Sequence, residues 1–355
     1  MEYKISNGNK PVSLICLIAG AVLFVAGLVL DFMGTGNSMR GAFLVIGVVG
    51  LIAGLWLFPT EKNHRTIINV IFLFPLLFAF AVTVIIPLVL GIGYSFTDWD
   101  GIRMTKVVGF ENYAKMFNQS SFLWSILITF LFVMFNMILI NLVAFLLALL
   151  CTSKLKGMGF FRAAYFVPNL IGGIVLGYIW QFVFSNVVTK WTTALFDRQY
   201  SMLSDTNTAF AAIIIVYIWQ YAGYIMLIYI TGLNTVPGEV LEAAAIDGAS
   251  PMQTLFNIKI PMIAPTITIC TFLTLTNAFK MFDVNLSLTN GTGSVDFMGS
   301  YLTNGTEMLA LNIYSTAVIE NKYSFGEAKA VLFFIILAAV SIIQVKITSS
   351  KEVEL

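Results

Sequence analysis

The stretch EAAAIDGASPMQTLFNIKIP, residues Glu242–Pro261, interrupts a chain that is otherwise almost entirely apolar. It makes up most of a polar loop, residues 236–261, between two long apolar segments. Connections between packed helices are usually about 2–8 residues long. A loop of this length is therefore expected to contact another molecule.

The polar loop carries the start and stop signals of a first short helix. Pro237 can begin a helix, and Glu239 and Glu242 stand near its positive N-terminal end. Ala243–Ala245 continue it with strong helix formers. Gly248 ends it, as glycine does where the backbone turns left-handed.

A second short helix is predicted directly after this glycine. Ser250 has the features of an N-cap residue and Pro251 those of a first helical residue. Gln253 is the third-position partner that completes a capping box with Ser250. The sequence therefore predicts two short helices bent at Gly248.

The composition is typical of a membrane protein. Apolar residues make up 59% of the 355 residues and charged residues only 10%, whereas a soluble domain carries about 25% charged residues. The net charge of +1 gives no indication of a nucleic-acid partner. Cys16, Cys151 and Cys270 are scattered and His64 stands alone, so no disulfide framework and no metal site are expected.

Because lipid offers no hydrogen-bond partner to an open backbone, each apolar segment is expected to be helical. The predicted fold is an all-α integral membrane protein with eight transmembrane helices. Two additional helices occupy residues 1–66, a six-helix core with the polar loop occupies 67–347, and 348–355 form a tail. The predicted spans are 11–30, 41–58, 67–91, 122–151, 163–185, 210–233, 262–279 and 328–347.

The basic residues favour an orientation with both termini in the cytoplasm. On that topology the cytoplasmic segments hold ten of the nineteen Lys and Arg residues, although the outer segments are longer in total. Lys154, Lys156 and Arg162 cluster in one short connection, as cytoplasmic loops favour. We expect a multi-pass protein of a bacterial cell membrane, with the polar loop in the cytoplasm.

The source of energy for any uphill transport must lie in another chain. No Asp, Glu, Lys, Arg or His lies in the middle of a predicted span, and ion-driven carriers usually need such groups for coupling. The chain contains no Gly-Lys dipeptide, so it has no Walker A phosphate-binding loop.

One face of the predicted span 210–233 is both aromatic and polar. Its residues have the spacing i, i+3, i+4 and i+7 of a single helical face: Tyr217, Gln220, Tyr221 and Tyr224. Such a face suits sugar rings, which present apolar C–H patches together with hydroxyl groups. Asn277 and Asn136 are candidates for further hydrogen bonds to a solute. Ordinary helix–helix packing is the alternative role of all these residues.

The predicted outer connections 92–121, 186–209 and 280–327 are rich in Asn, Thr, Ser, Gly and Asp. The last contains the repeat Leu-Thr-Asn-Gly-Thr at 288–292 and again at 302–306. Asn-Gly is a strong turn signal, so a folded lobe is predicted there.

The polar loop resembles the signature loop of permease subunits of binding-protein-dependent ABC importers. That signature is Glu-Ala-Ala, three residues, Gly, nine residues, then Ile-x-Leu-Pro. The matching positions are Glu242, Ala243, Ala244, Gly248, Ile258 and Pro261. Ile260 replaces the usual leucine, and Asp247 lies in a flanking segment similar to the carbohydrate-uptake, maltose-type branch.

Three further segments resemble the same branch: Tyr94–Gly101, Gly109–Tyr113 and Phe325–Ala328. The similarity extends over the last six predicted spans. One departure is Asn290–Gly293, which has no proline where the family often has a Gly-Gly-Gly-Pro-like turn. The shape of this outer connection therefore does not follow from the resemblance.

The resemblance implies one half of a heterodimeric pore. Its implied partners are a second permease subunit, two cytoplasmic ATPase subunits, an extracytoplasmic sugar-binding protein and membrane lipid. The residues implied to couple to one ATPase are Glu242, Ala243, Ala244, Asp247, Gly248, Ile258 and Pro261. The partner ATPase would use ATP, while this chain would bind no cofactor and catalyse no reaction.

Other functions remain compatible with the residues alone. One is an ABC permease for a non-sugar solute, such as a polyol or glycerol phosphate. A second is a self-contained channel or facilitator, which would leave the polar loop without a purpose. A third is a membrane scaffold, in which the face around Tyr217 would serve only packing.

Overall fold

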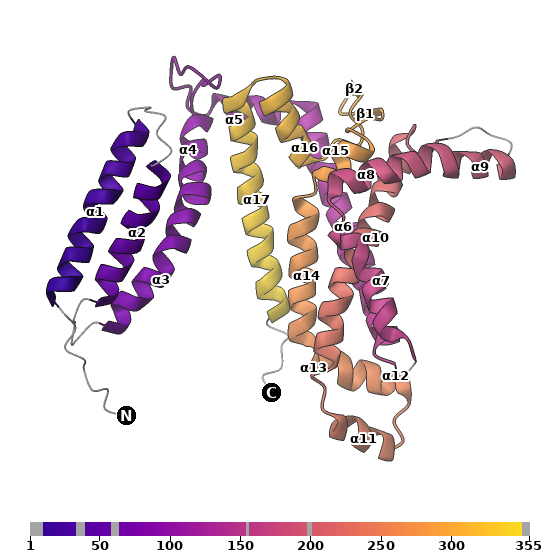
Figure 1. The fold of residues 1–355 in the computed structure, drawn as a ribbon. Coiled ribbons are helices and arrows are strands. Elements are labelled where there is room, and N and C mark those ends of the chain that lie inside the picture. The colour runs from indigo at the N-terminus through magenta and orange to yellow at the C-terminus, as the bar shows by residue number, and fades with distance from the viewer. Residues whose placement is uncertain (1–9, 33–39, 58–63, 154–155, 197–200, 350–355) are drawn as a thin grey trace. The chain divides into compact units, whose positions relative to one another are not determined.

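The structure is a computed structural model that describes residues 10–32, 40–57, 64–153, 156–196 and 201–349 (Figure 1). The chain divides into two compact units, residues 1–90 and 91–355. Lys154 and residues 350–355 of the predicted tail lie outside the described residues.

The membrane-protein class is confirmed, whereas the count of eight spans is not. Among the described residues, five helices are long and apolar enough to cross a membrane. The number rises to seven when each of two bent helix pairs counts as one span. The chain is therefore a mostly helical, multi-pass membrane protein.

The first unit begins with a tightly packed pair of helices, α1 (Lys10–Phe32) and α2 (Arg40–Leu57). They lie in the predicted spans 11–30 and 41–58. A Cβ added to Gly47 would come within 2.6 Å of the Phe24 nitrogen, so the two backbones touch there. The Ser13 hydroxyl donates to the Gly54 carbonyl at 2.6 Å. Small residues permit such close approach between transmembrane helices.

The predicted span 67–91 is one continuous helical stretch with a widened turn. It comprises α3 (His64–Phe80), the π-helical turn η1 (Ala81–Ile85) and α4 (Ile86–Ser95). The wide turn precedes Pro87, which has no N–H to donate to the Thr83 carbonyl. Within the wide turn the Ile86 N–H donates to the Ala81 carbonyl, five residues earlier. The helix continues to Ser95, beyond the predicted end.

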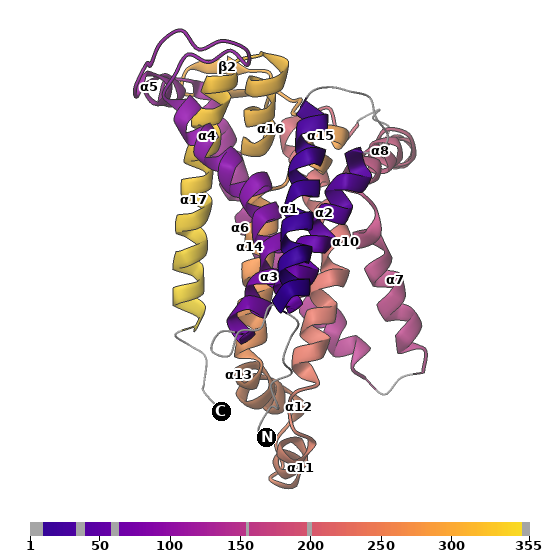
Figure 2. The ribbon, with the colours of Figure 1, turned by 60° about the vertical axis from the view of Figure 1, so that its left-hand side comes forward.

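The bundle of the second unit is built on α6 (Ser120–Cys151), α10 (Thr206–Leu233) and α14 (Ala264–Phe279). These helices run side by side (Figures 1 and 2), and α17 (Tyr323–Ser349) packs against α14. The predicted spans 122–151, 210–233 and 328–347 are confirmed as helices. Because α17 begins five residues before the predicted span, it also includes Glu327.

The predicted span 163–185 is broken by a sharp bend. This segment forms α7 (Met158–Leu170), α8 (Gly173–Phe182), the π-helical turn η2 (Val183–Val188) and α9 (Thr189–Phe196). The two halves are bent by 98° at a break after Leu170. Ile171 there is extended, with φ −81° and ψ 126°. Pro168 in the last turn of α7 and Gly172 in the break both weaken helix continuation.

The predicted span 262–279 is the helix α14, and a sharp bend separates it from the polar loop. The polar loop forms α11 (Gly238–Ile246), α12 (Pro251–Thr254), the π-helical turn η3 (Leu255–Lys259) and α13 (Ile260–Met262). The segment Pro251–Met262 meets α14 at an angle of 72°. Within the second unit, α11 and α12 lie at one end of the bundle (Figure 1).

The opposite end of this bundle carries a folded lobe, residues 281–322, which we call the distal lobe (Figure 1). It contains α15 (Asp283–Leu288), a hairpin of β1 (Val295–Phe297) and β2 (Ser300–Leu302), α16 (Leu309–Tyr314) and the π-helical turn η4 (Ser315–Ile319). The short helix α5 (Glu111–Phe117) lies at the same end.

The two Leu-Thr-Asn-Gly-Thr repeats pair with each other inside the distal lobe. The Thr306 hydroxyl donates to the Thr289 hydroxyl at 3.1 Å, and the Thr306 N–H donates to the Gly291 carbonyl at 3.3 Å. Asn290 has a φ of 50°, as its Asn-Gly turn requires. The predicted folded lobe is confirmed, and the repeat is the element that closes it.

Candidate functional site

The first helix of the polar loop ends as its sequence predicts. Gly248 has a φ of 76°. The Ala249 N–H donates to the Ala244 carbonyl at 2.9 Å, and the Gly248 N–H donates to the Ala245 carbonyl at 3.2 Å. These two bonds form a Schellman motif, which a residue with a Cβ supports poorly because of the left-handed backbone. Pro237 is the N-cap residue, so the helix itself begins at Gly238.

The second helix of the polar loop begins with the predicted capping box. The Gln253 N–H donates to the Ser250 hydroxyl at 3.3 Å, and the Ser250 N–H donates to the Gln253 side-chain oxygen at 2.7 Å. Pro251 is the first helical residue. The wide turn η3 then precedes Pro261, and at its end the Ile260 N–H donates to the Leu255 carbonyl, five residues earlier.

The polar loop presents an exposed surface that is partly apolar. Ile246 is 86% exposed, Met252 65% and Phe256 59%. Exposed apolar residues gathered on one element are typical of a contact surface. Most of the residues implied to couple to an ATPase are exposed, whereas Ala244 is buried and Ile258 is half-buried. The exposed ones are Glu242, Ala243, Asp247, Gly248 and Pro261.

Four of the predicted solute-path residues line one pocket of about 190 Å³. They come from α10 and α14: Tyr217, Gln220, Tyr221 and Asn277. The rings of Tyr217 and Tyr221 lie 4.4 Å apart at 41°. The Gln220 side-chain amide donates to the Ile171 carbonyl at 3.2 Å, which satisfies a backbone group left free by the break after α7.

The pocket also has walls that the sequence analysis did not identify. They are formed by Gly173 of α8 and by the turn from α14 into α15: Lys280, Met281, Phe282, Asp283 and Val284. The exposed Lys280 and Asp283 bring both signs of charge to its lining. In the sequence, Lys280 and Asp283 are visible only as two charges after a predicted span. Charges at such a place are also typical of an ordinary loop, so they did not indicate a pocket.

Two predicted path residues lie outside this pocket. Tyr224 packs against the main apolar core between the helices. Asn136 is fully buried, and its amide donates to the Phe132 carbonyl one turn earlier at 2.8 Å. A different asparagine of α6, Asn141, links three spans, because it accepts from the Tyr229 hydroxyl at 2.9 Å and donates to Thr274 at 3.3 Å.

The motif segments near residues 94–113 assemble into one structure. The Asn112 amide donates to the carbonyls of Ser95 and Thr97 at 2.9 and 3.0 Å. Trp99 stacks on Tyr94 with the ring centroids 4.3 Å apart, and its carbonyl accepts from the Ser324 N–H at 3.2 Å. The first two segments therefore form one structure, and Ser324, directly before the third segment, contacts it.

This region holds an acidic side chain with an altered proton affinity. Hydrogen bonds from the Thr105 side chain, and then from the Lys106 N–H, lower the pKa of Asp98 to about 2. The backbone N–H groups of Arg103 and Ile102 likewise lower the pKa of Asp100. Both carboxylates close the turn that follows α4.

Residues 157–350 match the family model of the binding-protein-dependent transport system inner membrane component. This range includes the polar loop, the pocket and the distal lobe. The chain belongs to this family. It is a permease of the carbohydrate-uptake branch of binding-protein-dependent ABC importers, as its relatives indicate.

One relative of the permease is the probable starch degradation products transport system permease protein AmyD of Thermoanaerobacterium thermosulfurigenes. It is 41% identical over 80% of this chain and 95% of its own length. A second is the multiple sugar-binding transport system permease protein MsmF of Streptococcus mutans, 31% identical over 75% and 90%. Both relatives are named as transport permeases, and the similarity covers nearly their whole length.

A chain of a bacterial ABC transporter that imports the acidic polysaccharide alginate has a similar fold. Its TM-score is 0.69 at 16% identity, covering 82% of the permease and 98% of that chain. At this identity the likeness concerns the fold alone, and it supports the arrangement of the membrane helices.

Proposed function

We propose that the permease carries a sugar across the membrane as one half of the translocation path of an ATP-driven importer. The observation that carries this proposal is the exposed, doubly capped polar loop in a member of a transport family. The names of two relatives, which refer to starch degradation products and to multiple sugars, support the substrate class.

The polar loop is proposed to be the element that couples to the ATPase. Its exposed Ile246, Met252 and Phe256 offer apolar area for docking in a cleft of the partner, and Glu242 offers a negative charge for a basic residue there. The Schellman turn at Gly248 fixes the angle at which the first helix meets the second. The chain contains no Walker A motif of its own, so ATP would be bound by the partner.

The proposed assembly has this permease, a second permease subunit, two cytoplasmic ATPase subunits and an extracytoplasmic sugar-binding protein. The polar loop and both termini would then face the cytoplasm, and the distal lobe would face the binding protein. ATPase closure would switch the spans between two packed arrangements by rigid-body rotation.

The pocket around Tyr217 and Tyr221 is the proposed sugar contact of this subunit. Its volume of about 190 Å³ is below the roughly 300–1,000 Å³ of complete small-molecule sites. We infer that it holds part of the solute and that the second permease completes the path. The tyrosine rings would cover apolar sugar faces, while Gln220, Asn277 and Asp283 would bond to hydroxyl groups.

The experiment for this proposal uses the assembled importer with Glu242→Lys. We expect co-purification of the ATPase and sugar uptake both to fall at least about tenfold, because the reversed charge opposes docking. Glu239→Lys is the matched control, since Glu239 is exposed on the same helix but outside the signature. Normal ATPase binding and uptake by Glu242→Lys would overturn the proposed role of the loop.

Substrate class is tested by uptake of labelled mono- and oligosaccharides together with a polyol and glycerol phosphate. We expect uptake of sugars only. Uptake of glycerol phosphate alone would contradict the sugar proposal and leave the coupling role of the polar loop intact.

A further inference from the structure

One lysine of α17 is completely buried, although lysine is among the residues most rarely found inside a protein. Lys329 has no exposed surface. Its neighbourhood is a second apolar cluster at the distal end of the bundle, separate from the main core. That cluster is centred on Met116, Phe122 and Leu309.

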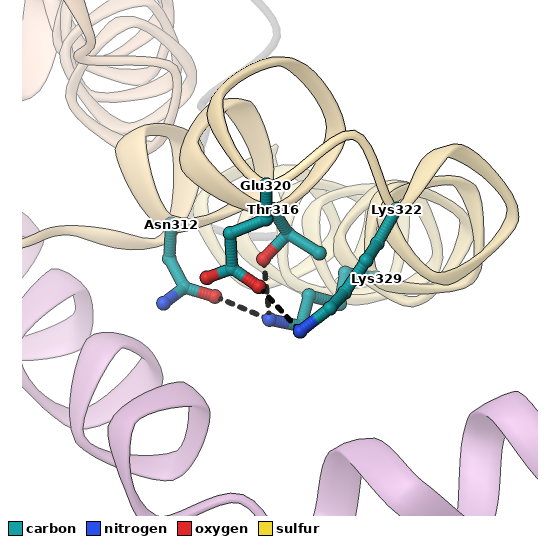
Figure 3. Close-up of polar contacts among 5 residues, drawn as sticks. All are labelled: Asn312, Thr316, Glu320, Lys322 and Lys329. Atoms are coloured by element: carbon teal, nitrogen blue, oxygen red, sulfur yellow. Dashed lines mark hydrogen bonds and ion pairs between the residues drawn. The ribbon is translucent and has the colours of Figure 1, made fainter. Parts of the chain in front are cut away.

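The ammonium group of Lys329 has two specific acceptors on the preceding helical segment (Figure 3). It donates to the Asn312 side-chain oxygen at 2.9 Å and to the Thr316 hydroxyl at 2.8 Å. Asn312 lies on α16 and Thr316 on η4, and both are nearly fully buried.

A carboxylate is linked to this ammonium through the same asparagine. The Asn312 amide nitrogen donates to Glu307 at 3.2 Å, and the Asn304 amide donates to the same oxygen of Glu307. Glu307 is only 7% exposed. Asn312 thus bridges a buried negative and a buried positive charge, with its oxygen toward the lysine and its nitrogen toward the glutamate.

Two aromatic rings occupy the remaining side of the ammonium. The Lys329 Nζ lies 5.2 Å from the ring centroid of Phe122 on α6 and 4.7 Å from that of Phe325 on α17. Both distances are within the range of a cation–π contact. One charged group therefore contacts α6, α16, η4 and its own helix.

Stability alone does not explain why this charge is buried. An apolar side chain of similar volume often stabilises a protein as well as a buried charge does, or better. A buried ammonium differs in that it demands particular acceptors in one geometry, since leaving it unpaired is costly. Lys329 therefore selects one position of α16 and η4 relative to α17.

We propose that Lys329 is a positioning residue that locks α16 and η4 to α17 and α6, so that movement of these spans reaches the distal lobe. This proposal rests on the proposed importer function. The polar loop and the distal lobe lie at opposite ends of the bundle, and the lock supplies a rigid link at the far end (Figure 1). Without it, α17 would move while the lobe lagged behind.

The test compares Lys329→Met with Lys322→Met in the reconstituted complex with its ATPase and binding protein. Lys322 is 61% exposed and pairs with Glu320 at 2.8 Å, just before the same helix, so it is the matched control. The measured quantity is sugar taken up per ATP hydrolysed. We expect this ratio to fall about fivefold or more for Lys329→Met and to stay unchanged for Lys322→Met.

A role in folding alone predicts a different result. Uptake and ATP hydrolysis would then fall together, in proportion to the amount of assembled complex, and the ratio would not change. That outcome, or full activity of Lys329→Met, would overturn the proposal.

Thr316→Val provides a milder variant should Lys329→Met fail to assemble. It removes one acceptor at constant volume, and we expect the ratio to fall about twofold. Thr268→Val is its control, because the Thr268 hydroxyl bonds only within its own helix, to the Ala264 carbonyl. An equal ratio of sugar uptake to ATP hydrolysis in the two threonine variants would overturn the proposed role of Lys329. Absence of sugar uptake by the unaltered complex would instead refute the importer function.

Discussion

The polar loop and the distal lobe are both polar insertions between spans, yet they are held together in opposite ways. In the polar loop the bonds that set the geometry join neighbours, such as Ser250 and Gln253, three residues apart. In the distal lobe they join distant residues: Trp124 donates to Gly305 across 181 positions. The polar loop is exposed, whereas the distal lobe is hydrogen-bonded to the helices of the bundle.

Substitutions in the two regions should therefore have different consequences. A change in the polar loop should alter what it contacts without loosening the bundle. A change in the distal lobe should loosen the lobe itself, because buried polar groups there depend on partners far away in sequence.

The largest effect is expected from Gly248→Pro. Proline fixes φ near −65°, whereas Gly248 has φ 76° and its N–H bonds to Ala245. We expect uptake to fall at least about tenfold with no change in the thermal stability of the bundle. Gly238→Pro is the control, because the first helical position tolerates proline. Equal uptake by the two variants would contradict the proposed coupling geometry.

A loss of stability is expected from Asn285→Leu in the distal lobe. Asn285 is fully buried, donates to the Thr306 carbonyl at 2.8 Å and accepts from the Met308 N–H at 3.0 Å. Stranding these groups should cost about 3 kcal/mol, measured as a lower unfolding temperature in detergent. Asn118→Leu removes only an exposed bond within one helix and should change little. Similar stability of both variants would show that the lobe is not held by this network.

A smaller and strictly local effect is expected from Ser250→Ala. Loss of the capping box should cost about 1 kcal/mol, seen as faster amide hydrogen exchange over residues 252–259. The distal lobe should keep its exchange rates. Ser153→Ala, which removes an exposed bond to the Leu150 carbonyl, is the control. Faster exchange in the lobe as well would mean that the two ends are not independent.

The smallest effect concerns pH at the turn that follows α4. Because its hydrogen bonds lower the pKa of Asp98 from 3.8 to about 2, its contribution to local stability is present above pH 3.8. It is lost as the pH falls through about 2. Fluorescence of Trp99, which stacks on Tyr94, should report this transition, and Asp98→Asn should abolish it. A transition that persists in Asp98→Asn would assign it to another group.

Sequence reasoning succeeded where the signals are local. The capping box at Ser250 and the left-handed stop at Gly248 depend on residues within one or two turns. The face of Tyr217, Gln220 and Tyr221 follows from helical spacing, so these residues were found together. The size of the bend in the predicted span 163–185 could not be predicted, because apolar composition says nothing about the angle at the break between Pro168 and Gly172.

Sequence reasoning missed residues whose surroundings come from remote parts of the chain. Asp283 and Lys280 look like ordinary loop charges until the turn after α14 brings them into the pocket. Lys329 lies near the start of a predicted span, where a lysine commonly reaches toward the membrane surface. Only the packing of α16 and η4 against α17 gives it two acceptors and no exposure.

The membrane class, the family signature and the ends of the two helices in the polar loop follow from the sequence alone, because hydropathy and caps act over short distances. The broken span after α7, the pocket walls and the surroundings of Lys329 follow only from the packing of remote segments. Each of these depends on which distant backbone or side-chain group satisfies a buried polar atom, and local sequence does not specify that partner.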